Sequence, residues 1–185
     1  MIDATRWVRA LCVPAMAAVL ACVLPGCHKA GSEQASGTST STAAPALALS
    51  GRVVDAADVL DASRRRSLTA LSERLEQDTK VQLVVATTPS LGGSEIKAYS
   101  LKLANAWGLG DRKRNDGLLL LVAPHERKVR IEVGRGLEGR LPDARCREIV
   151  DTMLPHFSAG DIPGAIALGA AKLDIAVRQT SASVH

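Results

Sequence analysis

Hydrophobic and polar residues follow regular patterns along residues 51–178, and these patterns predict strands that alternate with helices. Residues 118–123 are apolar at every position, which is typical of a central strand covered on both faces. In residues 128–133 apolar and charged residues alternate, which predicts a half-buried strand. About four turn residues separate the two segments, so the pattern favours an antiparallel hairpin.

A third strand and four helices are predicted around this hairpin. The β-branched run from Val81 to Thr87 favours a strand. Capping and helix-ending residues set the expected helix bounds. The first helix is capped by Asp61 or Ser63 and runs to about Asp78, and the second is capped by Ser94 and ends at Gly108 and Gly110. The third follows Pro142, and the fourth is capped by Asp161. Helices on both faces of a small mixed sheet are then the economical arrangement, which is an α/β fold.

Residues 1–26 have the features of a signal peptide. Two arginines precede an apolar run, residues 10–24, that is too short for a membrane-spanning helix of ~20 residues. The run ends in Leu-Pro-Gly-Cys, which resembles the lipobox of bacterial lipoproteins, with Pro25 where a small residue is usual. The resemblance implies cleavage after Gly26 and lipidation of Cys27. An ordinary secretory signal and an uncleaved anchor are the two alternatives.

The residues at the predicted cleavage site indicate where the protein is held. A lipidated Cys27 would hold the protein on a membrane. His28 follows it where Asp would signal inner-membrane retention, which implies the outer membrane of a bacterial cell envelope, with the domain facing the periplasm.

Residues 27–50 are rich in Ser, Thr and Ala and predict a flexible linker. Residues 51–178 have the size of one domain, and residues 179–185 are expected to be a disordered tail.

Composition narrows the function classes. The domain has few aromatic residues, which argues against single-stranded nucleic acid as a partner. The net charge of +4 falls to about +3 without the signal, too little to indicate a particular partner. Cys146 would be the one thiol of the mature domain, so no intramolecular disulfide is expected. Its apolar position on a predicted helix favours a small buried side chain over a catalytic thiol.

The block from Asn115 to Ala144 carries a family resemblance. It contains Asn-Asp-Gly-Leu-Leu-Leu-Leu-Val and then Ile-Glu-Val-Gly-x-Gly-Leu-Glu-Gly-x-Leu-x-Asp-Ala. This order resembles the TPM domain family, which includes a plant thylakoid-lumen protein and many bacterial envelope proteins. The resemblance extends over most of residues 51–177, with Pro142 where the family often has Thr. It implies a three-layer α/β/α sandwich with a groove at one end of the sheet.

Carboxylates are the main candidates for chemistry, because the chain has no His/Cys metal cluster, nucleophile elbow or P-loop. Asp55 is expected in the entry loop before the first helix, Asp116 before the central strand, and Asp143 at the start of the third helix. Oxygen ligands from three loops suit Ca²⁺ or Mg²⁺, and the family resemblance implies such an ion as well. Glu138 is a weaker candidate ligand. The alternative is that the aspartates are turn and helix-cap residues.

Three functions remain open from the sequence. The first is an accessory or interaction module with a divalent cation in its groove; by analogy with the plant relatives, its partner would be a membrane protein complex. The second is a metal-assisted phosphatase, in which a metal on Asp116 and Asp143 polarises the phosphoryl oxygens and Arg135 or Arg140 binds the phosphate. With no nucleophile evident, an activated water would attack. The third is a purely structural envelope protein.

Overall fold

The computed structural model of the protein describes residues 47–182. These residues form one four-stranded sheet with the strand order β1-β2-β3-β4, together with four α-helices and one short 3-10 helix. The elements in chain order are β1 (Val53–Asp55), α1 (Ala62–Thr79), β2 (Gln82–Thr87), α2 (Ile96–Trp107), β3 (Gly117–Ala123), β4 (Lys128–Val133), η1 (Arg135–Leu137), α3 (Asp143–Ser158) and α4 (Ile162–Ala182).

The sheet is mixed. β1, β2 and β3 run parallel to one another, and β4 runs antiparallel to β3. The predicted hairpin is therefore confirmed, and its register places Leu118 opposite Val133. The carboxyl ends of the first three strands share one end of the sheet, so the start of β3 and the end of β4 lie together at the opposite end.

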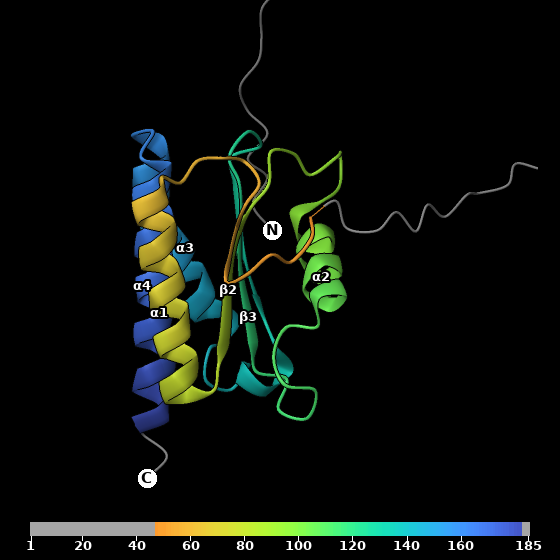
Figure 1. Ribbon diagram of the computed structural model, residues 1–185, viewed down its shortest axis with the longest axis vertical. Coiled ribbons are helices and arrows are strands. Elements are labelled where there is room, and N and C mark those ends of the chain that lie inside the picture. Colours follow the sequence, from red (N-terminus) through yellow and green to blue (C-terminus); the bar gives the residue numbers. More distant parts are fainter. Residues whose placement is uncertain (1–46, 183–185) are drawn as a thin grey trace, which may run out of the picture. The chain divides into compact units, whose positions relative to one another are not determined.

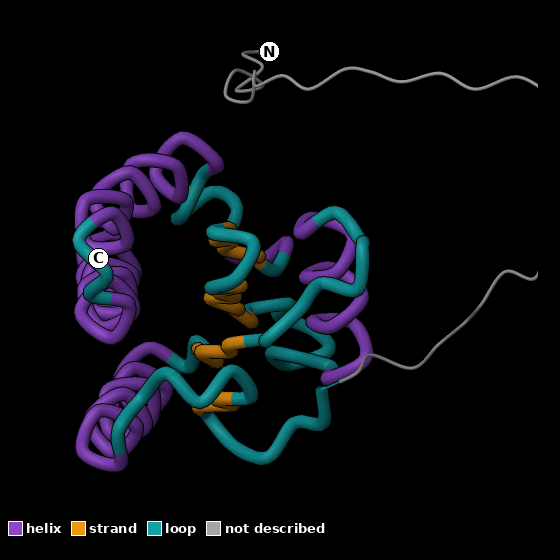
Figure 2. Tube along the Cα trace, turned by 90° about the horizontal axis from the view of Figure 1, so that it is seen from above, coloured by secondary structure: helices purple, strands orange, loops and turns teal. Residues whose placement is uncertain are grey.

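Helices cover both faces of the sheet, as Figures 1 and 2 show. α1, α3 and α4 pack on one face, and α2 packs on the other. All seven positions of β3 are buried, because this central strand has helices on both sides. The larger cluster of buried apolar side chains lies under α1, α3 and α4, and a smaller one lies under α2. The expected α/β sandwich is confirmed.

Helix ends follow the expected capping chemistry with one exception. Asp61 caps α1 by accepting the backbone N–H of Arg64 at 2.7 Å, and Gly108 ends α2 in the left-handed conformation. The Asp161 side chain accepts the backbone N–H of Gly164 at 2.9 Å in the first turn of α4. The exception is α2, which begins after Glu95 rather than Ser94 and has no side-chain cap.

Three expected boundaries need correction. Asp55 is the last residue of β1, so it does not lie in a loop. α4 continues to Ala182, past the expected end of the domain at residue 178. Leu47 already contacts the domain, because its carbonyl accepts the indole N–H of Trp107 at 3.1 Å.

The signal, the lipidation site Cys27 and most of the linker lie outside the described residues. The last three residues of the expected tail also lie outside them. Within residues 47–182, no helix combines the length and the apolar composition needed to span a membrane.

Candidate functional site

A groove of about 390 Å³ lies between α2 and the β3–β4 hairpin, at the end of the sheet where β3 begins. Pockets for small ligands have volumes of about 300–1,000 Å³, so this groove falls in that range. α2 forms one wall with Leu101, Ala104 and Asn105. The opposite wall includes Asn115, Glu132 and Arg135. The groove therefore combines apolar and polar side chains, and its charged residues, Glu132 and Arg135, lie on the wall opposite α2.

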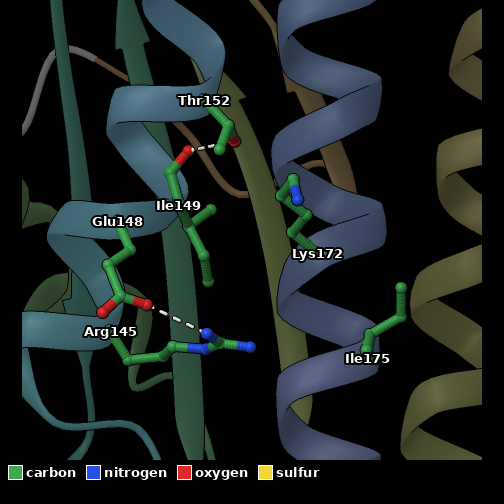
Figure 3. Close-up of a pocket in the computed structure, with 6 residues that line it drawn as sticks. All are labelled: Arg145, Glu148, Ile149, Thr152, Lys172 and Ile175. Atoms are coloured by element: carbon green, nitrogen blue, oxygen red, sulfur yellow. Dashed lines mark hydrogen bonds and ion pairs between the residues drawn. The ribbon is translucent and has the colours of Figure 1, made fainter.

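Two smaller depressions lie on the other face. One of about 180 Å³ lies between α3 and α4, where Arg145 pairs with Glu148 at 2.9 Å beside Ile149 (Figure 3). The other, of about 250 Å³, lies between β4 and α3. Both are smaller than ordinary ligand pockets. The α2–β4 groove is therefore the candidate site.

The loop of residues 111–116 borders the groove through Asn115, and Asp116 organises this loop. The Asp116 side chain is 8% exposed and accepts the backbone N–H of Asp111 at 2.8 Å. It also accepts the side-chain Nε of Arg114 at 2.5 Å. Asp111 in turn accepts the backbone N–H groups of Lys113 and Arg114. Two carboxylates and one guanidinium thus hold the loop closed.

The electrostatics of the loop agree with these contacts. The backbone N–H groups of Arg114 and Lys113 lower the pKa of Asp111 below its usual value. The hydrogen bond to Asp116 raises the pKa of Arg114. Asp111 and Asp116 both pair with the Arg114 guanidinium, at 3.8 and 2.5 Å.

Two glycines allow the end of β4 to pack against this loop. A Cβ on Gly134 would lie 2.2 Å from the carbonyl oxygen of Asn115, and one on Gly136 would lie 1.8 Å from that of Arg114. The Gly136 N–H also donates to the Asn115 carbonyl at 3.0 Å. Only glycine fits at such distances, so the glycines serve close backbone packing.

Glu132 supplies the polar group on the floor of the groove. Its side chain is 17% exposed and points to the α2 face of the sheet. The buried Ser100 hydroxyl donates to Glu132 Oε2 at 2.9 Å, and Arg130 Nε lies 3.3 Å from the same oxygen. Sequence reasoning placed Glu132 on the polar face of β4 but missed its partner on α2. It also missed Asp111 and Arg114, although both stand within five residues of Asp116.

The expected carboxylate ligands do not come together. Asp55 pairs with Thr87 at the carboxyl end of β2, whereas Gly117, next to Asp116, pairs with Gln82 at its other end. The two aspartates are thus separated by about 17 Å of strand. The Asp55 carboxylate accepts backbone N–H groups of residues 59 and 60 and the Thr87 hydroxyl. It acts as a buried cap for the turn after β1.

Asp143 and Glu138 also lie apart from Asp116. Asp143 opens α3 and faces β4 from the side opposite the groove, next to Cys146. Glu138 is the exposed residue that ends η1. Within residues 47–182, no group of three or more His, Cys, Asp or Glu side chains is placed to hold a metal ion.

The two candidate arginines occupy different places. Arg135 lines the groove. Arg140 Nη2 instead donates to the carbonyl of Val177 at 2.9 Å, which ties the segment before α3 to α4. A phosphate in the groove would therefore meet Arg135 and not Arg140.

Cys146 has the environment expected of a structural residue. The residue is 7% exposed, and burial raises the pKa of the thiol from 9.0 to about 11. A neutral, buried thiol is a poor nucleophile.

The fold and the groove define a class of protein: an open α/β domain whose groove lies at the amino end of the central strand. The sequence matches the TPM domain over residues 53–176, so the chain belongs to the TPM domain family. No curated protein matches the chain.

Solved structures of similar domains agree with this membership. The N-terminal domain of a Porphyromonas gingivalis protein is 35% identical, with a TM-score of 0.65, and the match covers 70% of this chain and 83% of that one. Two others share the fold. The N-terminal domain of a Corynebacterium glutamicum protein is 18% identical, with a TM-score of 0.55, and the match covers 68% of this chain and 78% of that one. The BA42 protein of Bizionia argentinensis is 15% identical, with a TM-score of 0.59, and the match covers 66% of this chain and 84% of that one.

Proposed function

We propose that the protein is a lipid-anchored accessory module of the bacterial cell envelope. It is attached to the outer membrane through Cys27 and binds a segment of a membrane protein complex in the α2–β4 groove. A divalent cation, Ca²⁺ or Mg²⁺, binds the loop of residues 111–116 and sets the shape of the groove.

The observation that supports this proposal is the pair of carboxylates in the loop of residues 111–116, which borders the groove through Asn115. The loop of residues 111–116 offers two carboxylates, Asp111 and Asp116, and Arg114 is the cation that pairs with both. The Asp111 side chain is 41% exposed, so an ion can approach it from solvent. Hard cations prefer such carboxylate and backbone carbonyl oxygens. A divalent ion would take the place of the Arg114 guanidinium and free that side chain.

Calorimetric titration of Ca²⁺ and Mg²⁺ into the full-length protein tests the cation site. We expect binding that is lost in Asp116→Asn and in Asp111→Asn. Arg114→Gln should bind more tightly than the wild type, because it removes the competing charge. Asp143→Asn is the matched control: it lies on the other face of the sheet and should leave binding unchanged.

Two results would contradict this cation site. Titrations of the wild type that show no heat of binding for either ion would mean that Asp111 and Asp116 only shape the loop. Loss of binding in Asp143→Asn with retention in Asp111→Asn would move the ion to the other face.

The anchor is tested separately. Cys27→Ser should move the protein from the membrane fraction to the soluble periplasmic fraction and abolish incorporation of radiolabelled palmitate. A Cys27→Ser protein that stays with the membrane would indicate an uncleaved anchor instead.

A metal-assisted phosphatase is the second candidate, and the position of Arg135 on the groove wall favours it. A metal held by Asp116 would polarise a phosphoryl oxygen, and the guanidinium of Arg135 would bind the phosphate. Hydrolysis of an aryl phosphate should then fall in Asp116→Asn and Arg135→Gln but not in Arg140→Gln. Cation binding without turnover would leave the accessory role as the function.

A further inference from the structure

β4 is an edge strand whose outer side has no strand partner within residues 47–182. The N–H of Gly134 donates to the Gly117 carbonyl at 2.8 Å, which continues the β3–β4 ladder by one pair. Bonded and non-bonded pairs alternate in an antiparallel ladder. Arg130 and Glu132 therefore direct their backbone groups to β3. The backbone groups of Val129, Ile131 and Val133 point outward.

Apolar side chains border this open edge on both faces. On the α3 side, the depression of about 250 Å³ has an apolar half, Val129, Ile131, Cys146 and Val150, and a charged half, Arg130, Asp143, Arg147 and Asp151. On the α2 side, Leu101 is 47% exposed at the wall of the groove. An added strand would therefore gain backbone hydrogen bonds and bury apolar surface on both of its faces.

We propose that the open edge of β4 pairs with β4 of a second copy of this chain, in antiparallel orientation about a two-fold axis at Ile131. The outward backbone groups of Ile131 then bond those of the partner's Ile131. Val129 pairs in the same way with the partner's Val133. The apolar side chains of the two strands lie side by side on the α3 face.

The charged residues of β4 favour this register, and they favour a second copy of the chain as the partner strand. On the α2 face, Arg130 lies opposite the partner's Glu132, and the two-fold axis repeats the contact. Opposite charges in directly facing pairs stabilise a sheet, and like charges destabilise it. Pairing displaced by two residues would place either Arg130 opposite the partner's Arg130 or Glu132 opposite the partner's Glu132. The sequence Lys-Val-Arg-Ile-Glu-Val is thus its own complement in one register.

The resulting dimer is closed. It doubles the four-stranded sheet into one continuous sheet and uses the β4 edge of both copies, so no third copy can add there. The two α2 helices lie on one face of this sheet, with Leu101 of each copy directed along the shared edge.

Complementary charge variants of the full-length protein test the pairing. In Arg130→Glu, each new Glu faces the partner's Glu132; in Glu132→Lys, each Arg130 faces the partner's new Lys. Each variant alone should self-associate about tenfold more weakly than the wild type. Mixed together, the two variants should form a heterodimer, because every facing pair is again of opposite charge. Sedimentation of differently tagged chains in detergent measures this, and circular dichroism checks that each variant is folded.

A second variant removes a hydrogen bond instead of a charge. Val129→Pro deletes an N–H that only the second copy would accept, and proline is tolerated on the open side of an edge strand. The dimer should weaken in Val129→Pro and persist in the matched control Val129→Ala.

Three results would overturn the proposal. One is a wild-type chain that remains a monomer at the highest concentration tested. Another is a mixture of the two charge variants that forms no heterodimer while the wild type dimerises. The third is recovery of a different protein on the β4 edge in place of a second copy. The pairing does not involve the cation loop, so Asp116→Asn should lose Ca²⁺ binding and keep the dimer.

Discussion

Buried polar side chains in this domain have local structural tasks, and Asp55 is the clearest example. Its carboxylate is 2% exposed and joins the turn after β1 to the Thr87 hydroxyl and to Arg65. Three neutral donors and one cation converge on it, so this buried carboxylate has its hydrogen-bond partners within the fold. An aspartate that looked like a metal ligand in the sequence is therefore a cap.

Replacing Asp55 with Ala should lower the free energy of unfolding by about 2–4 kcal/mol, because it leaves several buried donors without an acceptor. Urea unfolding measures the change. Asp151→Ala is the control: Asp151 is an exposed residue of α3, and its loss should change the free energy by less than about 0.5 kcal/mol. Equal effects of the two substitutions would show that Asp55 does not cap the turn.

Cys146 gives a prediction for alkaline pH. Burial raises the pKa of the folded thiol to about 11, so the unfolded chain loses this proton first as the pH rises. The free energy of unfolding should therefore fall between pH 9 and 11, and Cys146→Ala should show a smaller fall over that range. Chemical unfolding of the two proteins over this pH range measures the free energies. The difference between them reports the Cys146 thiol, because all other titrating groups are the same in both. Identical slopes would contradict a buried neutral thiol.

At the scale of elements, the sequence predicted what local patterns determine. The apolar run of β3, the alternation in β4 and the caps of α1 and α4 all depend on neighbouring residues, and each prediction was confirmed. β1 has only three residues, too few to show a period, so the sequence pattern predicts a loop where Asp55 ends this strand. The separation of Asp55 from Asp116 follows from parallel pairing over long sequence distances, which no local pattern specifies.

The contact between the end of β4 and the loop before β3 depends on the absence of a side chain at Gly136. Gly136→Ala should destabilise the protein by about 1–3 kcal/mol, because the new methyl group would overlap the Arg114 carbonyl. Gly139→Ala is the matched control, since nothing lies within 4 Å of a Cβ there. Thermal unfolding of both variants measures the difference. A Gly136→Ala protein as stable as the wild type would show that the loop moves away at little cost.

At the scale of the whole molecule, the two faces of the sheet differ in their helical cover. Three helices and the larger apolar cluster stabilise one face, while α2 alone covers the other over a smaller cluster. Local opening is easiest where few apolar contacts must be broken. We therefore expect the wall of the candidate groove to be the less stable side of the domain.

Hydrogen–deuterium exchange followed by mass spectrometry tests this difference. Backbone amides of α2 should exchange faster than those of α1 and α4, because α2 opens without disturbing the larger cluster. Amides of β3 serve as the reference for global unfolding, since this strand is buried throughout. Uniform protection of all the helices would mean that the two faces unfold together.

The first contacts of the domain have a mechanical consequence. The described chain begins at Leu47, which bonds to Trp107 and packs against the smaller apolar cluster, and then forms β1, which pairs with β2 over three residues only. A pulling force applied to the chain before Leu47 reaches Trp107, at the carboxyl end of α2, and then β1 before it reaches the β2–β3 ladder. The domain would thus yield first at Leu47 and β1, and the β3–β4 side of the groove would keep its strand pairing under loads that already detach this edge.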